Sequence, residues 1–149
     1  MDKNSFVSSV MKKYNLNMST LPSRIAFQKT FYLLKELGEN VEFTFVWHNF
    51  GPYCQELASL GFLITKEQKT ISTEFKTESS EKFEKLISEK VGDSRFLELL
   101  SDIVFIKKMN PNISDLELFF RIISHRSYLE NKEEFNLALS KLKNIQLIQ

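Results

Sequence analysis

The segment that most constrains the fold of this chain is an apolar stretch that begins near Asp93 and runs to about Met109. Apolar side chains occupy most of its helical circumference: Phe96, Leu97, Leu99, Leu100, Ile103, Val104, Phe105 and Ile106. A helix that is apolar nearly all round must be buried on most of its sides. Asp93 is suited to cap its start, and Asn110-Pro111 stops it. We therefore expect a central helix with the other elements packed around it.

The composition favours a single domain over residues 1–149. A chain of 149 residues is long enough to bury a substantial core, and its 14 Phe residues are distributed along the whole length. Only 4 Gly and 3 Pro residues are present, which leaves no stretch suited to a flexible linker. We expect a core that extends from one end of the chain to the other.

Apolar periodicity and capping residues predict helices at both ends of the chain. One covers residues 2–14, and a second covers residues 22–37, where Thr20 and Pro22 form the start and Gly38 the end. Three helices besides the central one are expected in a C-terminal helical part, residues 79–149. Their start signals are Ser79 or Ser80, the capping box of Ser114 with Glu117, and a looser box of Asn131 with Glu134.

The middle of the chain contains the predicted β structure. Residues 41–48 are rich in β-branched and aromatic side chains, which is typical of a strand. Gly51 ends this strand, Pro52 is placed to open the next helix, and Gly61 is placed to end it. A β-hairpin is predicted from two further strand-like runs, residues 62–65 and 70–75.

The order of these elements predicts the fold class. Helix, strand, helix and hairpin follow one another over residues 22–76, which is the order of a winged helix. The expected fold is mainly α with a small β component (α+β). It consists of a winged-helix-like N-terminal unit followed by about four packed helices.

No arrangement of residues typical of catalysis or of metal binding is present in the sequence. His48 and His125 have no second ligand at metal spacing, and the scattered Gly residues supply no phosphate-binding loop. Cys54 at a predicted helix start could be a reactive thiol, since a helix N-terminus lowers a thiol pKa. A small buried side chain is the simpler interpretation. We expect no enzymatic activity, no metal and no cofactor.

The single Cys54 excludes a disulfide within the chain, which favours a reducing compartment. The first residues show no apolar core of a signal peptide, and no apolar run approaches the length of a membrane span. We therefore expect a cytoplasmic protein without membrane contact.

Binding of nucleic acid has to be considered because of the winged-helix order. Residues 1–37 carry six basic and two acidic side chains, although the formal net charge of the whole chain is only +1. The helix in the recognition position, Pro52 to Leu60, contains Glu56 and no Lys or Arg, which is a poor electrostatic match to DNA. The candidate contacts are Lys12, Lys13, Arg24, Lys29, Gln55, Lys66 and Lys69.

Residues 22–64 carry a pattern of helix, glycine, aromatic strand, Gly-Pro and a second helix. The motif residues are Gln28, Lys29, Tyr32, Gly51, Pro52, Tyr53 and Leu57. The pattern resembles that of the YwgA-like family and the related Panacea antitoxin-domain family. The resemblance implies a non-enzymatic regulatory or defence-associated protein that works by binding, and it supplies no catalytic residues.

We therefore expect first a regulatory protein that acts through a protein partner. An antitoxin-like role is included in this expectation. A winged-helix DNA-binding transcriptional regulator is the alternative. The tail contains Ile145, Leu147 and Ile148 and is too apolar for a free end. It either docks on the core or completes a homodimer interface.

Overall fold

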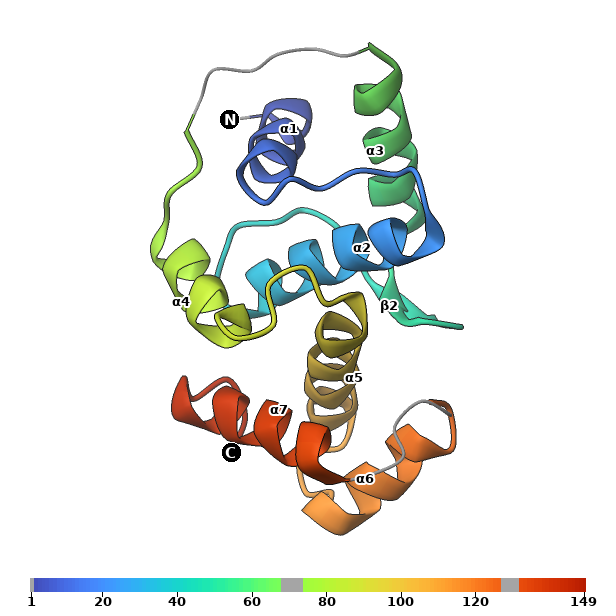
Figure 1. Ribbon diagram of the computed structural model, residues 1–149, viewed down its shortest axis with the longest axis vertical. Helices are drawn as coiled ribbons and strands as arrows, with labels where there is room; N and C mark the ends of the chain where they lie inside the picture. The colour runs from blue at the N-terminus through green and yellow to red at the C-terminus, as the bar shows by residue number, and fades with distance from the viewer. Residues whose placement is uncertain (1, 68–73, 127–131) are drawn as a thin grey trace.

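A computed structural model describes residues 2–67, 74–126 and 132–149 (Figure 1). Within these ranges the chain forms seven helices and one antiparallel sheet of two strands, so the expected α+β class with mainly helical content is confirmed. The elements are α1 Lys3–Lys13, α2 Leu21–Glu36, β1 Val46–His48, β2 Gly51–Tyr53, α3 Gln55–Glu67, α4 Glu78–Ile87, α5 Ser94–Met109, α6 Asp115–Ile123 and α7 Lys132–Asn144.

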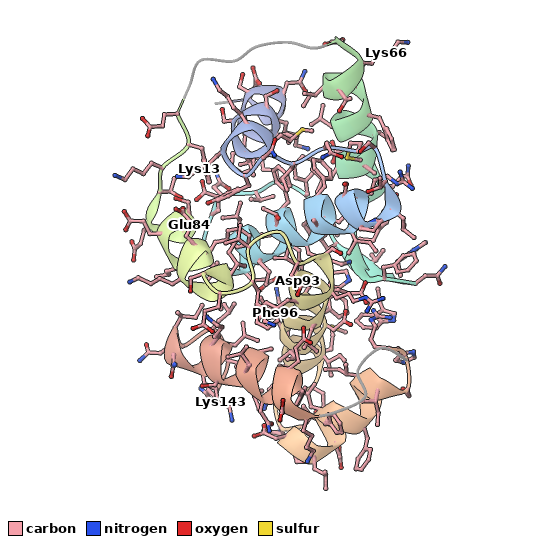
Figure 2. The ribbon with its side chains drawn as sticks, in the orientation of Figure 1. Lys13, Lys66, Glu84, Asp93, Phe96 and Lys143 are labelled. Carbon is pink, nitrogen blue, oxygen red and sulfur yellow. The ribbon has the colours of Figure 1, made fainter. Side chains whose placement is uncertain are left out.

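The expected central helix is confirmed as α5. It runs down the middle of the molecule and packs against α2, β2, α6 and α7 (Figure 1). Its apolar residues from Phe96 to Ile106 are buried, apart from Phe105, which is half-buried, and Met109 at its end is exposed. The Asp93 carboxylate accepts a hydrogen bond from the Phe96 amide (3.1 Å), and Figure 2 shows both residues at the start of the helix. The apolar circumference is therefore matched by partners on several sides.

Most of the predicted capping signals act as expected. The Ser23 amide donates to Thr20 Oγ1 (3.1 Å) at the start of α2, and Gly38 adopts a φ of 111° just after its end. The Glu117 amide donates to Ser114 Oγ (3.1 Å) at the start of α6. One position is corrected: Thr77, rather than Ser79 or Ser80, caps α4. Thr77 can do so because Ser80 completes a reciprocal capping box with it. The predicted cap of the last helix, Asn131, lies outside the described residues.

The predicted strand over residues 41–48 is shorter in the structure. Only Val46–His48 forms β1, which pairs with Gly51–Tyr53 in the register Val46 with Tyr53 and His48 with Gly51. Pro52 therefore belongs to β2 and does not open a helix, and α3 begins at Gln55. A proline is tolerated here because a two-stranded sheet consists only of edge strands.

The predicted hairpin wing is wrong where it can be examined. Residues 62–65 lie in α3, which continues through Gly61 to Glu67. Gly61 is required by packing: a Cβ there would lie 2.7 Å from Phe27 Cζ of α2. Residues 70–73 of the predicted second strand lie outside the described residues, and Glu74 and Phe75 adopt no regular structure. The order of a winged helix is thus not present in the described part of the chain.

The C-terminal tail docks on the core. Ile148 is buried within the main hydrophobic cluster, and Ile145 and Leu147 pack against that cluster. The Leu147 amide also donates to the Leu142 carbonyl (3.0 Å) at the end of α7. The first of the two interpretations of the apolar tail is therefore what the structure shows, while a homodimer stays a prediction.

Candidate functional site

Two neighbouring side chains of α2 hold the chain between β2 and α3. Gln28 Nε2 donates to the Cys54 carbonyl (2.9 Å), and the Cys54 amide donates to Gln28 Oε1 (2.9 Å). Lys29 Nζ donates to the Pro52 carbonyl (2.6 Å). Both side chains are buried, so α2 supplies partners to the Cys54 amide and the Pro52 carbonyl. The Cys54 carbonyl also accepts from the Ala58 amide (3.1 Å). Four residues of the predicted motif region are thus brought into direct contact.

The turn that precedes Pro52 is held from the other side by α5. Gly51 has a φ of 91°, and a Cβ at this position would overlap Asp102 Oδ1. Arg126 Nε donates to Asp102 Oδ2 (2.8 Å) and also pairs with Glu98, while Arg126 Nη1 donates to the Asn49 carbonyl (3.1 Å). We call Lys29, Glu98, Asp102 and Arg126 the ionic cluster. Glycine is needed at position 51 because the cluster approaches the backbone so closely.

Burial dominates the protonation equilibria of Asp102 and Lys29 in the ionic cluster. It raises the pKa of Asp102 to about 7, although Arg126 and Lys29 favour the charged carboxylate. It lowers the pKa of Lys29 to about 8, although Asp102 and Glu98 favour the charged amine. Asp102 Oδ1 accepts no hydrogen bond in the structure, which is consistent with a carboxylate that is costly to ionise.

Two further motif residues belong to the core. Leu57 is fully buried in the main cluster. Tyr32 is buried as well, and its ring packs edge-on against Phe45 with the centroids 5.2 Å apart. Burial raises the pKa of Tyr32, and its hydroxyl has no hydrogen-bond partner among the described residues. Both residues are part of the hydrophobic core, and neither lines the pocket beside the turn.

A pocket of about 240 Å³ opens beside the turn, between the beginning of α2, α3 and the β1–β2 loop. We call it the α2–α3 pocket. Its apolar wall comprises Met18, Leu21, Ile25, Phe50, Ala58 and Phe62, and its polar lining comprises Arg24, Gln28, Lys29, His48 and Tyr53. Leu21, Phe50 and Phe62 remain 45%, 41% and 50% exposed. Large apolar side chains exposed around a concave site are typical of an interaction surface.

The motif residues form part of this pocket. Gln28 and Lys29 lie at its buried end, while the turn that they hold carries His48, Phe50 and Tyr53 into the lining. The rings of His48 and Tyr53 lie 4.9 Å apart at 30°, and the Tyr53 hydroxyl donates to Gln55 Oε1 (3.1 Å). The shape of the pocket therefore depends on the contacts between α2 and the turn.

The candidate nucleic-acid contacts do not form one basic face. Lys29 is only 1% exposed, and Lys13 Nζ is held by the Phe75 carbonyl (2.6 Å) and Glu84 (3.6 Å). Figure 2 shows Lys13 beside Glu84, whereas Lys66 lies at the far end of α3. Lys12 is exposed on α1, Arg24 lines the α2–α3 pocket, Gln55 binds Tyr53, and Lys69 lies outside the described residues.

The residues considered for catalysis are dispersed. The Cys54 side chain is 5% exposed, and its backbone rather than its thiol is bound by Gln28. His125 lies beside Trp47, with the ring centroids 6.1 Å apart. In the three described ranges, no group of three or more His, Cys, Asp or Glu residues is placed to hold a metal ion.

Sequence reasoning missed the ionic cluster and the exposed rim of the pocket. Glu98 and Asp102 were the available signal, because they lie four residues apart in the middle of a helix, where the other positions from Phe96 to Ile106 are apolar except for Ser101. Their partner Arg126 comes from the segment that follows α6, which no local pattern connects with α5.

Comparison with protein-family models, with curated proteins and with solved structures found no match to this chain in any of the three. None of the helices in the described segments is long and apolar enough to cross a membrane. The α2–α3 pocket and the turn beside it are therefore the features that indicate a function.

Proposed function

We propose that this chain is a non-enzymatic regulatory protein that binds a protein partner through the α2–α3 pocket. The observation that carries the proposal is the exposed apolar rim formed by Leu21, Phe50 and Phe62 around a concave site. Aromatic and aliphatic anchors at the centre of a contact surface supply most of the binding energy in protein interfaces. We place the protein in the cytoplasm, since its only cysteine is a buried thiol.

The size of the pocket favours a protein side chain over a small-molecule cofactor. Sites for small molecules usually measure roughly 300–1,000 Å³ and enclose most of the ligand. The α2–α3 pocket measures about 240 Å³ and is open at its rim. A single large side chain from a partner fits such a depression, and the exposed rim contacts the residues that flank this side chain.

The resemblance to the YwgA-like and Panacea families supports the same function. Its motif residues Gln28, Lys29, Gly51 and Pro52 build the contact between α2 and the turn, and that contact shapes the pocket. An antitoxin-like or defence-associated role follows from this resemblance as part of the proposal.

The alternative of a DNA-binding regulator has less support from the geometry. The helix in the recognition position, α3, has Glu56 in its first turn, where it pairs with Lys3 (2.9 Å). Farther along α3, Phe62 and Leu63 are exposed, which suits an apolar contact better than a phosphate backbone.

Affinity capture from native lysate tests the proposal, with and without nuclease treatment. We expect a protein partner that survives nuclease and whose yield falls at least tenfold for Phe62→Ala. Phe120→Ala is the matched control, because Phe120 is also an exposed phenylalanine on a helix (56% against 50%) but lies on α6.

Two results would contradict the proposal. A partner captured equally by Phe62→Ala and by the control would show that the pocket is not the interface. A partner that disappears after nuclease treatment would favour the DNA-binding alternative.

A further inference from the structure

We propose that the α2–α3 pocket selects a partner segment in which an aromatic or large aliphatic side chain stands next to a carboxylate. This inference rests on the proposed function and specifies the chemistry of the partner. It follows from the distribution of charge in the pocket lining and from the state of Arg24.

The charged side chains of the pocket lining are Arg24 and Lys29, and the lining contains no Asp or Glu. Lys29 is already engaged, because it donates to the Pro52 carbonyl and lies in the field of Asp102 and Glu98. Arg24 differs from it. Its Nη1 donates to the Met18 carbonyl (3.2 Å), and no carboxylate of the described ranges forms an ion pair with it.

The surroundings of Arg24 make a carboxylate the complementary group. A guanidinium presents several N–H donors in a planar fork, and a carboxylate accepts two of them at once. Arg24 is half-buried beside Leu21 and Ile25, and the first turn of α2 contains no acidic residue. An anionic group that binds Arg24 therefore does not compete with an acidic side chain from the first turn of α2.

The apolar lining determines what accompanies the carboxylate. Phe50 and Phe62 are exposed at the rim, and the rings of His48 and Tyr53 lie close together, tilted at 30° to each other. An aromatic ring packs against such rings in offset or edge-on geometry. Arg24 is half-buried in the same lining, so a carboxylate next to a side chain in the 240 Å³ depression can reach it.

A nucleic acid is the less suitable ligand, although aromatic side chains can stack on bases. Nucleic-acid affinity depends on several cations along the phosphate backbone. In the described part of the chain, the α2–α3 pocket supplies one partly exposed cation without a carboxylate partner, Arg24, and Lys29 is buried at its inner end. One positive charge matches one carboxylate.

The test uses two small probes that differ only in charge, N-acetyl-phenylalanine and its uncharged amide. Both are titrated into the full chain labelled with ¹⁵N, and the amide resonances of residues at the pocket are followed. We expect the acid to bind about tenfold more tightly than the amide, which is a typical gain for a charge-assisted contact. Arg24→Gln should abolish this difference by weakening binding of the acid.

Two variants serve as controls. Arg121→Gln removes an exposed arginine from α6 and should preserve the preference for the acid. Arg24→Lys keeps the charge but not the fork and should give an intermediate preference. Thermal melting of each variant checks that the fold is intact.

Three outcomes would overturn the inference. They are equal affinities for the acid and the amide, an acid preference that Arg24→Gln leaves intact, and tighter binding of an oligothymidylate than of the acid at the same resonances. The capture experiment with Phe62→Ala is independent of these titrations. A protein partner lost in that variant would uphold the proposed function even where the carboxylate preference fails.

Discussion

Gly51 shows how one residue can be fixed by a neighbour that is distant in sequence. Its φ is 91°, a region that residues with a Cβ rarely adopt, and Asp102 Oδ1 occupies the space where a Cβ would lie. We predict that Gly51→Ala lowers the free energy of unfolding by about 3 kcal/mol, because backbone strain and overlap act together. Urea denaturation measures the loss.

Gly92→Ala is the matched control for this prediction. Gly92 also has a positive φ, 80°, but no atom lies within 4 Å of the position of an added Cβ. This variant therefore measures the backbone cost alone, about 1 kcal/mol. Equal losses for the two variants would show that the contact with Asp102 is of no consequence for stability.

Asp102 should give the protein a characteristic dependence of stability on pH. Burial raises its pKa from 3.8 to about 7 in the folded chain, so the neutral form is favoured by folding. The corresponding stability is fully present below about pH 4 and is lost as the pH rises toward 7. Asn cannot titrate, so the free energy of unfolding of the wild type should fall relative to that of Asp102→Asn between pH 4 and 7.

Urea denaturation of both proteins across this pH range measures the difference between their free energies of unfolding. The contributions of the other carboxylates, which both proteins share, cancel in this difference. Glu98, Lys29 and Arg126 face Asp102 in both proteins, so only the titration at position 102 is removed directly. A wild type that gains stability relative to the variant over the same range would show that Arg126 keeps the carboxylate ionised throughout.

At the scale of elements, the glycine at position 61 of α3 is explained by packing against other elements rather than by local sequence signals. At an exposed position inside a helix, replacement of Gly by Ala stabilises the helix by about 1 kcal/mol. Gly61 is buried, so packing has to be considered as well. Here an added Cβ would lie 2.7 Å from Phe27 Cζ and 3.1 Å from Met18 Sδ. We predict a net loss of about 1 kcal/mol, because overpacking costs about 1–3 kcal/mol.

A double-mutant cycle with Phe27→Leu checks the cause of this loss by thermal or urea denaturation. Removal of the Phe27 ring gives the new methyl group room, so Gly61→Ala should become stabilising in the Phe27→Leu background. Additive effects of the two substitutions would contradict the close contact as the reason for glycine.

The helices could be predicted from the sequence because their signals are local. Thr20, Asp93 and Ser114 each cap a helix with their own side chains, and the apolar circumference of α5 indicates burial directly. The run Phe62–Thr65 had no such signal. A short apolar segment fits a strand or a helix equally well, and here it continues α3, which packs against α1 and α2.

The candidate site was predictable only in part for the same reason. Gln28, Lys29 and the turn were recognised as a family pattern, but that pattern did not reveal that the two side chains bind the backbone of Pro52 and Cys54. The bond between Arg126 and Asp102 joins residues that are 24 positions apart. Such contacts are formed by tertiary packing and leave no periodic trace in the sequence.

For the molecule as a whole, α5 connects the turn beside the pocket with the C-terminal helices. It carries Asp102 and Glu98 on the side of the turn and packs against α6 and α7 elsewhere. Arg126, which follows α6, closes this arrangement through its bond to the Asn49 carbonyl. The C-terminal helices therefore support the turn that shapes the α2–α3 pocket, and we expect the proposed binding to require that half of the molecule to be intact.

Deletion of the C-terminal tail tests how far the C-terminal part of the chain stabilises the whole molecule. Ile148 is buried in the core, and Leu147 and Ile148 lie beside Val104 of α5. Deletion of residues 145–149 should lower the free energy of unfolding by about 2 kcal/mol, the value for one buried aliphatic side chain. The melting temperature should fall by about 6 °C with no change in mass by light scattering. Removal of the exposed Gln149 alone is the control and should have no effect. A dimer that becomes a monomer on deletion would instead assign the tail to a subunit interface.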